Sequence, residues 1–282
     1  MVSRDESPYL HQYLSENLNL ISIIIKLIFY FTEMKNGKMY SNIIYFKKIG
    51  STMDIAKEYA RKGYPEWTII VAEEQTSGRG RMNRKWVSPK GGLWFSIILR
   101  PKFEPKYVIH TGLIIALSIT EVLIEKYNLD AKVKWPNDVY IDNVGKIAGI
   151  LVESSITGFK IDFIIAGIGL NTNVDKKHLE DLKATSLLEL LGKRVDNKNI
   201  LRYIIDRIKL YYSLIPEGLP LIIGRYNNVL LNRGEIIRLK TPEGEVKGIL
   251  REIDSNAGIV LMNRNGNIVR YDVSKVIRAE FI

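Results

Sequence analysis

The feature of this sequence that most restricts its fold is the segment Lys106–Tyr127, which is apolar on nearly every side when it is arranged as a helix. A helix without a polar face is stable in a globular protein only where other elements cover it. The chain has 282 residues, and 46% of them are hydrophobic, which is enough to form a sizeable core. We therefore expect this helix in the interior of the protein.

Strands and helices alternate on both sides of this segment. Hydrophobic periodicity predicts strands at Ile43–Lys47, Trp67–Glu74, Leu93–Leu99, Lys132–Trp135, Val139–Asp142, Lys146–Ser155 and Lys160–Gly167. It predicts further helices at Thr52–Lys62, Thr185–Leu191, Lys198–Leu214 and Pro220–Asn228. Ser51 is placed to cap the first of these helices, with Asp54 at capping-box spacing. The pattern predicts an α+β fold with helices flanking a sheet.

The sequence pattern changes after Leu231, where short segments of alternating hydrophobicity, typical of strands, are separated by Gly- and Asn-rich turns. The strands are predicted at Ile236–Leu239, Val246–Glu252, Ile259–Met262 and Ile268–Tyr271. About fifty residues of this kind are typical of a small SH3-like β-barrel. We predict two domains, residues 40–230 and 231–282.

The first 39 residues differ from the rest and have no evident role. Leu18–Phe31 is very apolar, but it is interrupted by Lys26 and is shorter than the roughly 20 residues that span a bilayer. Three interpretations remain open: a helix packed on the domain, a membrane-associating segment, or an extension from an upstream start codon. In the last case Met34 or Met39 is the true start.

Composition excludes several classes of enzyme. There is no cysteine, so disulfides, thiolate metal sites and a cysteine nucleophile are excluded. The three histidines have no metal-ligand spacing. Net charge is +10, and between Thr76 and Lys106 eight Lys or Arg residues accompany one acid, Glu104. This local excess indicates a site for an anion.

The strongest local motif is Gly78–Trp86, which reads GRGRMNRKW. Glycines let a backbone approach a ligand closely, and arginine forks bind carboxylates and phosphates. The segment has neither the P-loop pattern nor the G-x-G-x-x-G pattern of dinucleotide sites. A mobile loop that closes over an anion fits these residues, and so does an Arg/Gly loop that binds nucleic acid.

Two further motifs follow strands. Lys134–Asp138 reads KWPND, and Gly145–Ile150 places one lysine, Lys146, in an otherwise apolar strand. Lysine is costly to bury unless it meets an anion, although an edge lysine can also extend its ammonium to water. Asp138 is equally compatible with a turn. The third motif, Gly167–Asn173, is compatible with ligand binding or with a plain strand-end turn.

Together these motifs resemble the biotin protein ligases. The resemblance rests on Ser51-Thr52, Gln75, the GRGR loop, the KWPND run, the GKIAGIL strand and GIGLN, in this order, and it extends from about residue 43 to the C-terminus. It implies a mixed sheet flanked by helices, like that of class II synthetases and biotin/lipoate ligases, with a small C-terminal SH3-like barrel. It also implies an enzyme that uses ATP to adenylate biotin and then transfers biotin to a lysine of a carrier protein domain.

The resemblance assigns roles residue by residue. It implies biotin contacts from Ser51, Thr52, Gln75, Gly78, Arg79, Gly80, Arg81, Lys146 and Gly149. It implies ATP contacts from Arg84, Trp86, Asn137, Lys146 and Asn171. The implied catalytic residues are Lys146, Arg81 and Asp138, with Asp138 as candidate base for the acceptor lysine. Mg²⁺ is expected to arrive with ATP, with no ligand set of protein side chains. Met53 departs from the pattern, because asparagine commonly follows the Ser-Thr pair.

Two other functions compete with this interpretation. A lipoate or octanoate ligase of the same fold typically carries an R-R-x-x-G-G-G loop, which is absent. A DNA-binding repressor is disfavoured, because about 40 apolar-rich residues before the catalytic region are too few for a three-helix DNA-binding module. We therefore expect a cytoplasmic enzyme with biotin, ATP and a carrier domain as partners, without nucleic acid or membrane partners. A homodimer is expected from the resemblance alone.

Overall fold

The computed structural model describes residues 42–281, so the predictions about Leu18–Phe31 and the first 39 residues lie outside the described part of the chain. A seven-stranded mixed sheet forms the centre, in the order β1-β2-β3-β7-β6-β5-β4. Only β1 and β2 pair in parallel; the other neighbours are antiparallel. The strands are β1 (Ile43–Phe46), β2 (Ile69–Ala72), β3 (Leu93–Leu99), β4 (Ala131–Lys134), β5 (Asp138–Ile141), β6 (Gly145–Thr157) and β7 (Lys160–Leu170).

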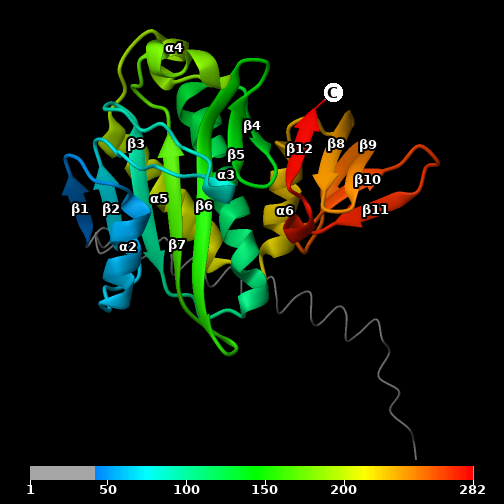
Figure 1. Ribbon diagram of the computed structural model, residues 1–282, viewed down its shortest axis with the longest axis horizontal. Helices are drawn as coiled ribbons and strands as arrows, with labels where there is room; N and C mark the ends of the chain where they lie inside the picture. Colours follow the sequence, from blue (N-terminus) through cyan, green and yellow to red (C-terminus); the bar gives the residue numbers. More distant parts are fainter. Residues whose placement is uncertain (1–41, 282) are drawn as a thin grey trace, which may run out of the picture.

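Helices cover both faces of this sheet (Figure 1). Helix α2 (Thr52–Arg61) packs on one face, over β2, β3 and β7. Helix α3 (Val108–Tyr127) packs on the other face, and α5 (Asn197–Ser213) and α6 (Leu219–Asn228) pack against it. All seven residues of β3 are buried, as expected for a strand that lies inside a sheet covered on both faces. The predicted mixed sheet flanked by helices is confirmed.

The interior position predicted for the apolar helix is confirmed. Helix α3 has 13 buried residues, and its buried Glu121 accepts hydrogen bonds from Arg207, Arg225 and Tyr211 of α5 and α6. A buried carboxylate needs such partners to offset its loss of hydration. Within residues 42–281, this helix with its preceding 3₁₀ turn is the one segment long and apolar enough to cross a membrane, and most of it lies inside the protein.

The C-terminal residues form a separate antiparallel sheet in the order β11-β10-β9-β8-β12, beside α6 (Figure 1). Its strands are β8 (Ile236–Thr241), β9 (Gly244–Ile253), β10 (Ile259–Met262), β11 (Ile268–Tyr271) and β12 (Arg278–Phe281). Strand β12 has no counterpart in the sequence prediction. The change of architecture near residue 231 agrees with the sequence, whereas closure of this sheet into a barrel stays a prediction.

Polar contacts join the C-terminal sheet to the rest of the fold. Trp135 Nε1 donates to the carbonyl of Ala257 over 2.9 Å, and His110 Nε2 donates to the carbonyl of Ser255 over 2.8 Å. Apolar side chains of both sheets belong to one continuous core. The two-domain division at residues 40–230 and 231–282 therefore stays a prediction about independent folding.

Shorter helical segments also lie around the site, among them the 3₁₀ turns η3 (Lys176–His178) and η4 (Glu180–Leu182). Helix α4 (Leu187–Leu191) is capped by Ser186, and a 3₁₀ turn, η1 (Arg81–Asn83), lies inside the Gly/Arg loop. Met82 and Asn83 have φ angles of 54° and 56°, so the loop reverses through the left-handed region. The predicted strand Trp67–Glu74 is shorter than expected, because Trp67 has a φ of 64° and the strand begins at Ile69.

Candidate active site

A cavity of about 340 Å³ opens on the face of the sheet that carries α2. Its walls come from the start of α2, the Gly/Arg loop, the KWPND run, strands β6 and β7, the segment before α4, and the last strand, β12. Segments far apart in the sequence thus converge on one site. Every residue that the sequence assigned to the site lines this cavity except Gly78. Their roles in binding and catalysis stay predictions.

One end of the cavity is neutral and polar. The side chain of Ser51 caps α2 by accepting from Met53 N at 3.3 Å. The Thr52 amide donates to Gln75 Oε1 over 2.8 Å, and the Thr52 hydroxyl lies 3.1 Å from the same oxygen. Gln75 Nε2 in turn donates to Ser88 Oγ over 2.9 Å. This network fixes the Ser-Thr pair and the glutamine relative to each other before any ligand is present.

The glycines of the site make room for Trp86. A Cβ on Gly169 would lie 2.3 Å from Trp86 Nε1, and a Cβ on Gly149 would lie 3.0 Å from Trp86 Cζ3. A Cβ on Gly78 would lie 2.5 Å from the carbonyl oxygen of Trp86. Gly78 therefore acts behind the cavity wall, where it lets the two arms of the loop approach. Gly149, expected to admit a ligand, also admits the indole and the side chain of Lys146, whose Nζ lies 3.2 Å from the same Cβ position.

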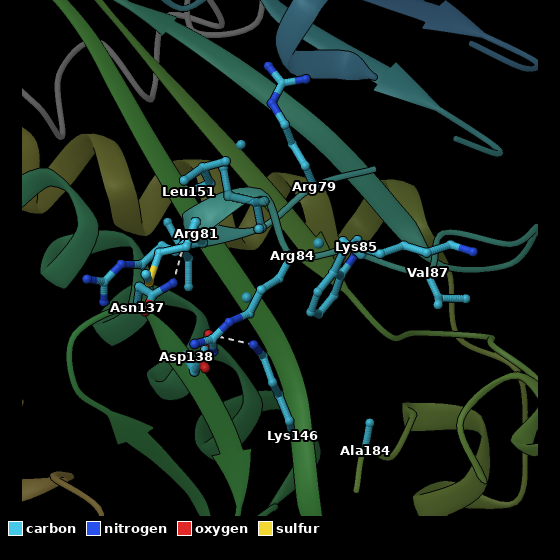
Figure 2. A pocket seen from close by; sticks show the side chains of 18 of the residues that line it. Arg79, Arg81, Arg84, Lys85, Val87, Asn137, Asp138, Lys146, Leu151 and Ala184 are labelled. Atoms are coloured by element: carbon cyan, nitrogen blue, oxygen red, sulfur yellow. Dashed lines mark hydrogen bonds and ion pairs between the residues drawn. The ribbon is translucent and has the colours of Figure 1, made fainter. Parts of the chain in front are cut away.

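The two arginines of the GRGR motif point in different directions (Figure 2). Arg79 extends toward α2, where Nη1 and Nη2 donate to the two carboxylate oxygens of Asp54 over 3.0 and 2.6 Å. This hydrogen bonding raises the pKa of Arg79. Arg81 turns into the cavity and lies 3.5 Å from Asn137 Oδ1. Burial lowers the pKa of the Arg81 guanidinium, which marks it as the less hydrated of the two.

At the centre of the site, Lys146 Nζ lies 2.7 Å from Asp138 Oδ1 (Figure 2). Asp138 is the first residue of β5 and pairs with Gly149, so the β5–β6 register brings the carboxylate to the lysine. Lys146 Nζ also lies 5.0 Å from the centre of the Trp86 ring. Figure 2 shows Arg84 extending toward this pair from the loop. Asp138 thus lies at the start of β5, directly after the turn at residues 135–137, and its role in the site stays a prediction.

The two asparagines of the site hold backbone. Asn137 Nδ2 donates to the carbonyl of Ile150 over 2.8 Å, which ties the KWPND run to β6. Asn171 is buried, and its Nδ2 donates to the carbonyl of Thr185 over 3.0 Å. This bond ties the end of β7 to the segment that leads into α4. Both residues shape the cavity wall, and a direct contact with a nucleotide stays a prediction for each.

The cavity is strongly cationic. Seven of its lining residues are Lys or Arg and one is a carboxylate: Arg79, Arg81, Arg84, Lys85, Lys134, Lys146 and Arg278 against Asp138. Loss of solvent lowers the pKa of Lys134 and raises the pKa of Tyr140 to about 12, so this region is partly shielded from water. Such a wall suits a ligand with several negative charges.

Sequence reasoning missed four polar residues of this wall: Lys85, Lys134, Tyr140 and Arg278. Lys85 lies inside the GRGRMNRKW motif. Lys134 belongs to the KWPND run itself, so the motif contained the signal, and Tyr140 follows two residues after Asp138 on the same strand. Arg278 gives no local signal, because it reaches the cavity only through the pairing of β12 with β8. Within residues 42–281, no group of three or more histidines or carboxylates could hold a metal ion.

Comparison with known proteins agrees with this geometry. The model of the biotin/lipoate A/B protein ligase family matches residues 45–171. The bifunctional ligase/repressor BirA of Bacillus subtilis is 33% identical over 240 residues, which are 83% of this chain and 73% of that protein. The biotin–[acetyl-CoA-carboxylase] ligase of Paracoccus denitrificans is 29% identical over 71% of this chain and 86% of its own length.

A solved structure supports the same relationship. The biotin protein ligase from Aquifex aeolicus, in complex with biotin and ATP, superposes with a TM-score of 0.72 and 30% identity. The match covers 86% of this chain and all of that one. The alignment extends beyond the family model into the C-terminal sheet. By sequence, by fold and by the residues gathered in its cavity, this chain belongs to the biotin/lipoate A/B protein ligase family, as one of its biotin protein ligases.

Proposed function

We propose that this protein activates biotin with ATP and transfers the biotinyl group to a lysine of a biotin carrier domain. One observation carries the proposal: a single cavity joins a neutral polar end to a cationic wall centred on the Lys146–Asp138 pair. Biotin has the same two-part character, with a ureido ring at one end and a carboxylate at the other. The similar ligase from Aquifex aeolicus binds both biotin and ATP, which supports the same pair of ligands here.

In the first step, two anions must meet, the biotin carboxylate and the triphosphate of ATP. Arg81, Arg84 and Lys146 line the cavity where they can offset this repulsion. The carboxylate attacks the α-phosphorus, the bond to the bridging oxygen breaks, and pyrophosphate leaves. Mg²⁺ bound to ATP would supply further neutralisation of charge on the phosphates. Positioning and charge stabilisation supply the catalysis, without a covalent enzyme intermediate.

Arg79 has a separate place in this scheme. Its guanidinium is held by Asp54 on the outer side of the loop, so it reaches a ligand carboxylate only after leaving that pair. We therefore assign the first contacts with the reacting carboxylate and α-phosphate to Arg81 and Lys146. A contact between Arg79 and biotin stays a prediction.

In the second step, the carrier's lysine amine attacks the acyl carbon of biotinyl-5′-AMP, and AMP leaves. Asp138 is the only carboxylate among the described residues that line the cavity, and it is therefore the candidate acceptor for the amine proton. The Gly/Arg loop lines the cavity, and by closing over the ligand it would keep water from the reactive mixed anhydride. The carrier partner, a cytoplasmic location and a homodimeric state belong to the same proposal.

The decisive experiment measures pyrophosphate release from MgATP when biotin is added, with lipoate and octanoate as parallel substrates. Release with biotin alone is the expected result. Release with lipoate or octanoate would retain the adenylation chemistry and change the acid. No release with any of the three acids would reject the proposal, and the Gly/Arg loop should then be tested for nucleic-acid binding.

A further inference from the structure

Met53 lies at the neutral end of the cavity, and the structure shows how its side chain fits there. It is the second residue of α2, it is 4% exposed, and it lines the cavity next to Ser51 and Thr52. Its side chain lies over Gly167 in β7: a Cβ on Gly167 would stand 2.6 Å from both Cγ and Sδ of Met53. Real atoms do not approach so closely, so the thioether fills the space that the glycine leaves empty.

The surroundings hold Met53 in this place. Behind it lies a small apolar cluster that includes Ala56, Ile98 and Ile165, so the side chain has packed atoms on its inner side. Beside it, the Thr52 hydroxyl lies 2.8 Å from Ser96 Oγ, and Ser96 pairs with Gly167 across the β3–β7 ladder. A side chain displaced from Gly167 therefore has one open direction, which is into the cavity.

We infer that the Met53–Gly167 pair closes the neutral end of the cavity and sets the size of the ring that the acid substrate can place there. The inference rests on the activity proposed above. The closed end has a polar side, made by Thr52 and Gln75, and an apolar, polarizable side, made by the methionine. The fused ring of biotin has the same two sides, a ureido ring and a sulfur-containing ring. Met53 then contacts the sulfur-containing ring.

The test combines two substitutions, one that displaces the Met53 side chain and one that removes it. Gly167→Ala forces Met53 toward the ligand, so the KM for biotin should rise at least tenfold while the KM for ATP changes less than twofold. Desthiobiotin keeps the ureido ring and lacks the sulfur-containing ring, so its KM should rise by less than threefold. Met53→Ala in the Gly167→Ala protein removes the displaced side chain and should restore the KM for biotin to within about threefold of wild type.

Controls separate the inference from general damage. Gly224→Ala is the matched control, because a Cβ there meets no atom within 4 Å and the residue lies outside the cavity. Met53→Val, which keeps more buried volume, replaces Met53→Ala if the latter double variant fails to fold. Circular dichroism checks folding of each variant before kinetics are measured.

The outcomes are distinct. Normal biotin kinetics in Gly167→Ala, an equal loss for biotin and desthiobiotin, or a folded double variant without recovery would each overturn the inference and leave the proposed activity standing. Failure of the wild-type protein to release pyrophosphate with biotin would overturn the proposed activity, and the inference with it.

Discussion

Replacement of Lys146 by alanine is the most informative single perturbation of this protein. Its ammonium lies 2.7 Å from Asp138, and the two side chains are 24% and 22% exposed. Both residues line the cavity, and Arg84 extends toward them from the loop (Figure 2). Lys146→Ala therefore removes a positive charge from the place where two substrate anions are proposed to meet, and it deprives Asp138 of this partner.

The structure allows the effects of Lys146→Ala on the catalytic rate and on folding stability to be estimated separately. Loss of one preorganised donor at a site of developing charge costs about 10²–10³ in rate, or about 2.7–4 kcal/mol. Breaking a fully buried pair costs about 3–5 kcal/mol of folding stability, and an exposed pair about 0–1 kcal/mol. Because this pair is about three-quarters buried, screening by the remaining solvent reduces the stability loss to about 1–2 kcal/mol. Catalysis should therefore suffer more than folding.

The assay is single-turnover formation of biotinyl-5′-AMP, with urea unfolding measured on the same samples. Lys132→Ala is a matched control: Lys132 is also a strand lysine, it pairs with Asp130 at 2.9 Å, and it lies outside the cavity. Asp138→Asn added to Lys146→Ala should restore stability without restoring adenylation. Adenylation by Lys146→Ala within tenfold of wild type, or an equal loss in Lys132→Ala, would refute this reasoning.

Three further predictions concern the loop, the pH dependence and the contact between the sheets. Asp54→Asn weakens the pairing of α2 with Arg79 of the Gly/Arg loop and should speed leakage of biotinyl-5′-AMP by up to about fivefold, because exposed pairs contribute about 0.2–1 kcal/mol. Rapid filtration measures this leakage. Burial lowers the pKa of His110 below its ordinary 6.5, so the unfolded chain binds the proton first, and stability present at neutral pH should be lost as the pH falls below 6.5. His110→Gln should flatten that dependence in thermal unfolding. Trp135→Phe removes the bond to the buried Ala257 carbonyl and should lower the free energy of unfolding in urea by about 1–3 kcal/mol.

Each of these three predictions has a control variant or an outcome that would contradict it. Glu58→Gln breaks an exposed pair with Lys62 on the same helix and should leave leakage unchanged; equal leakage from both variants would contradict the role of Asp54. His178→Gln should leave the pH dependence intact, and a pH profile unaltered in the His110 variant would refute the assignment. A Trp135→Phe protein as stable as wild type would show that the indole bond does not hold the two sheets together.

Local signals explain the parts of the fold that the sequence predicted well. Ser51 caps α2 as expected, because an N-cap depends on a side chain and a backbone amide two residues apart. The long apolar helix is buried as its pattern predicted. The motifs also identified the cavity, because motif residues at strand ends and in the Gly/Arg loop are near one another once the strands pair.

Other features had no local signal. Nothing in the GRGR motif distinguishes Arg79 from Arg81, yet one binds Asp54 outside the cavity and the other turns inward. The direction depends on the left-handed turn at η1 and on an acid on α2, 25 residues earlier in the chain than Arg79. Equally, the need for glycine at position 169 becomes evident only when Trp86 is seen lying over it.

The sequence by itself therefore determined the types of element, the buried helix and many of the residues that line the cavity, since periodicity, capping and motif chemistry act over a few residues. Only the tertiary structure decided which of those side chains point into the cavity and which bind other parts of the protein. Strand β12 pairs with β8, some forty residues away, and this pairing brings Arg278 to the cavity. Contacts at that separation depend on which surfaces are buried together and which strands become neighbours, and these are properties of the assembled core rather than of any one segment.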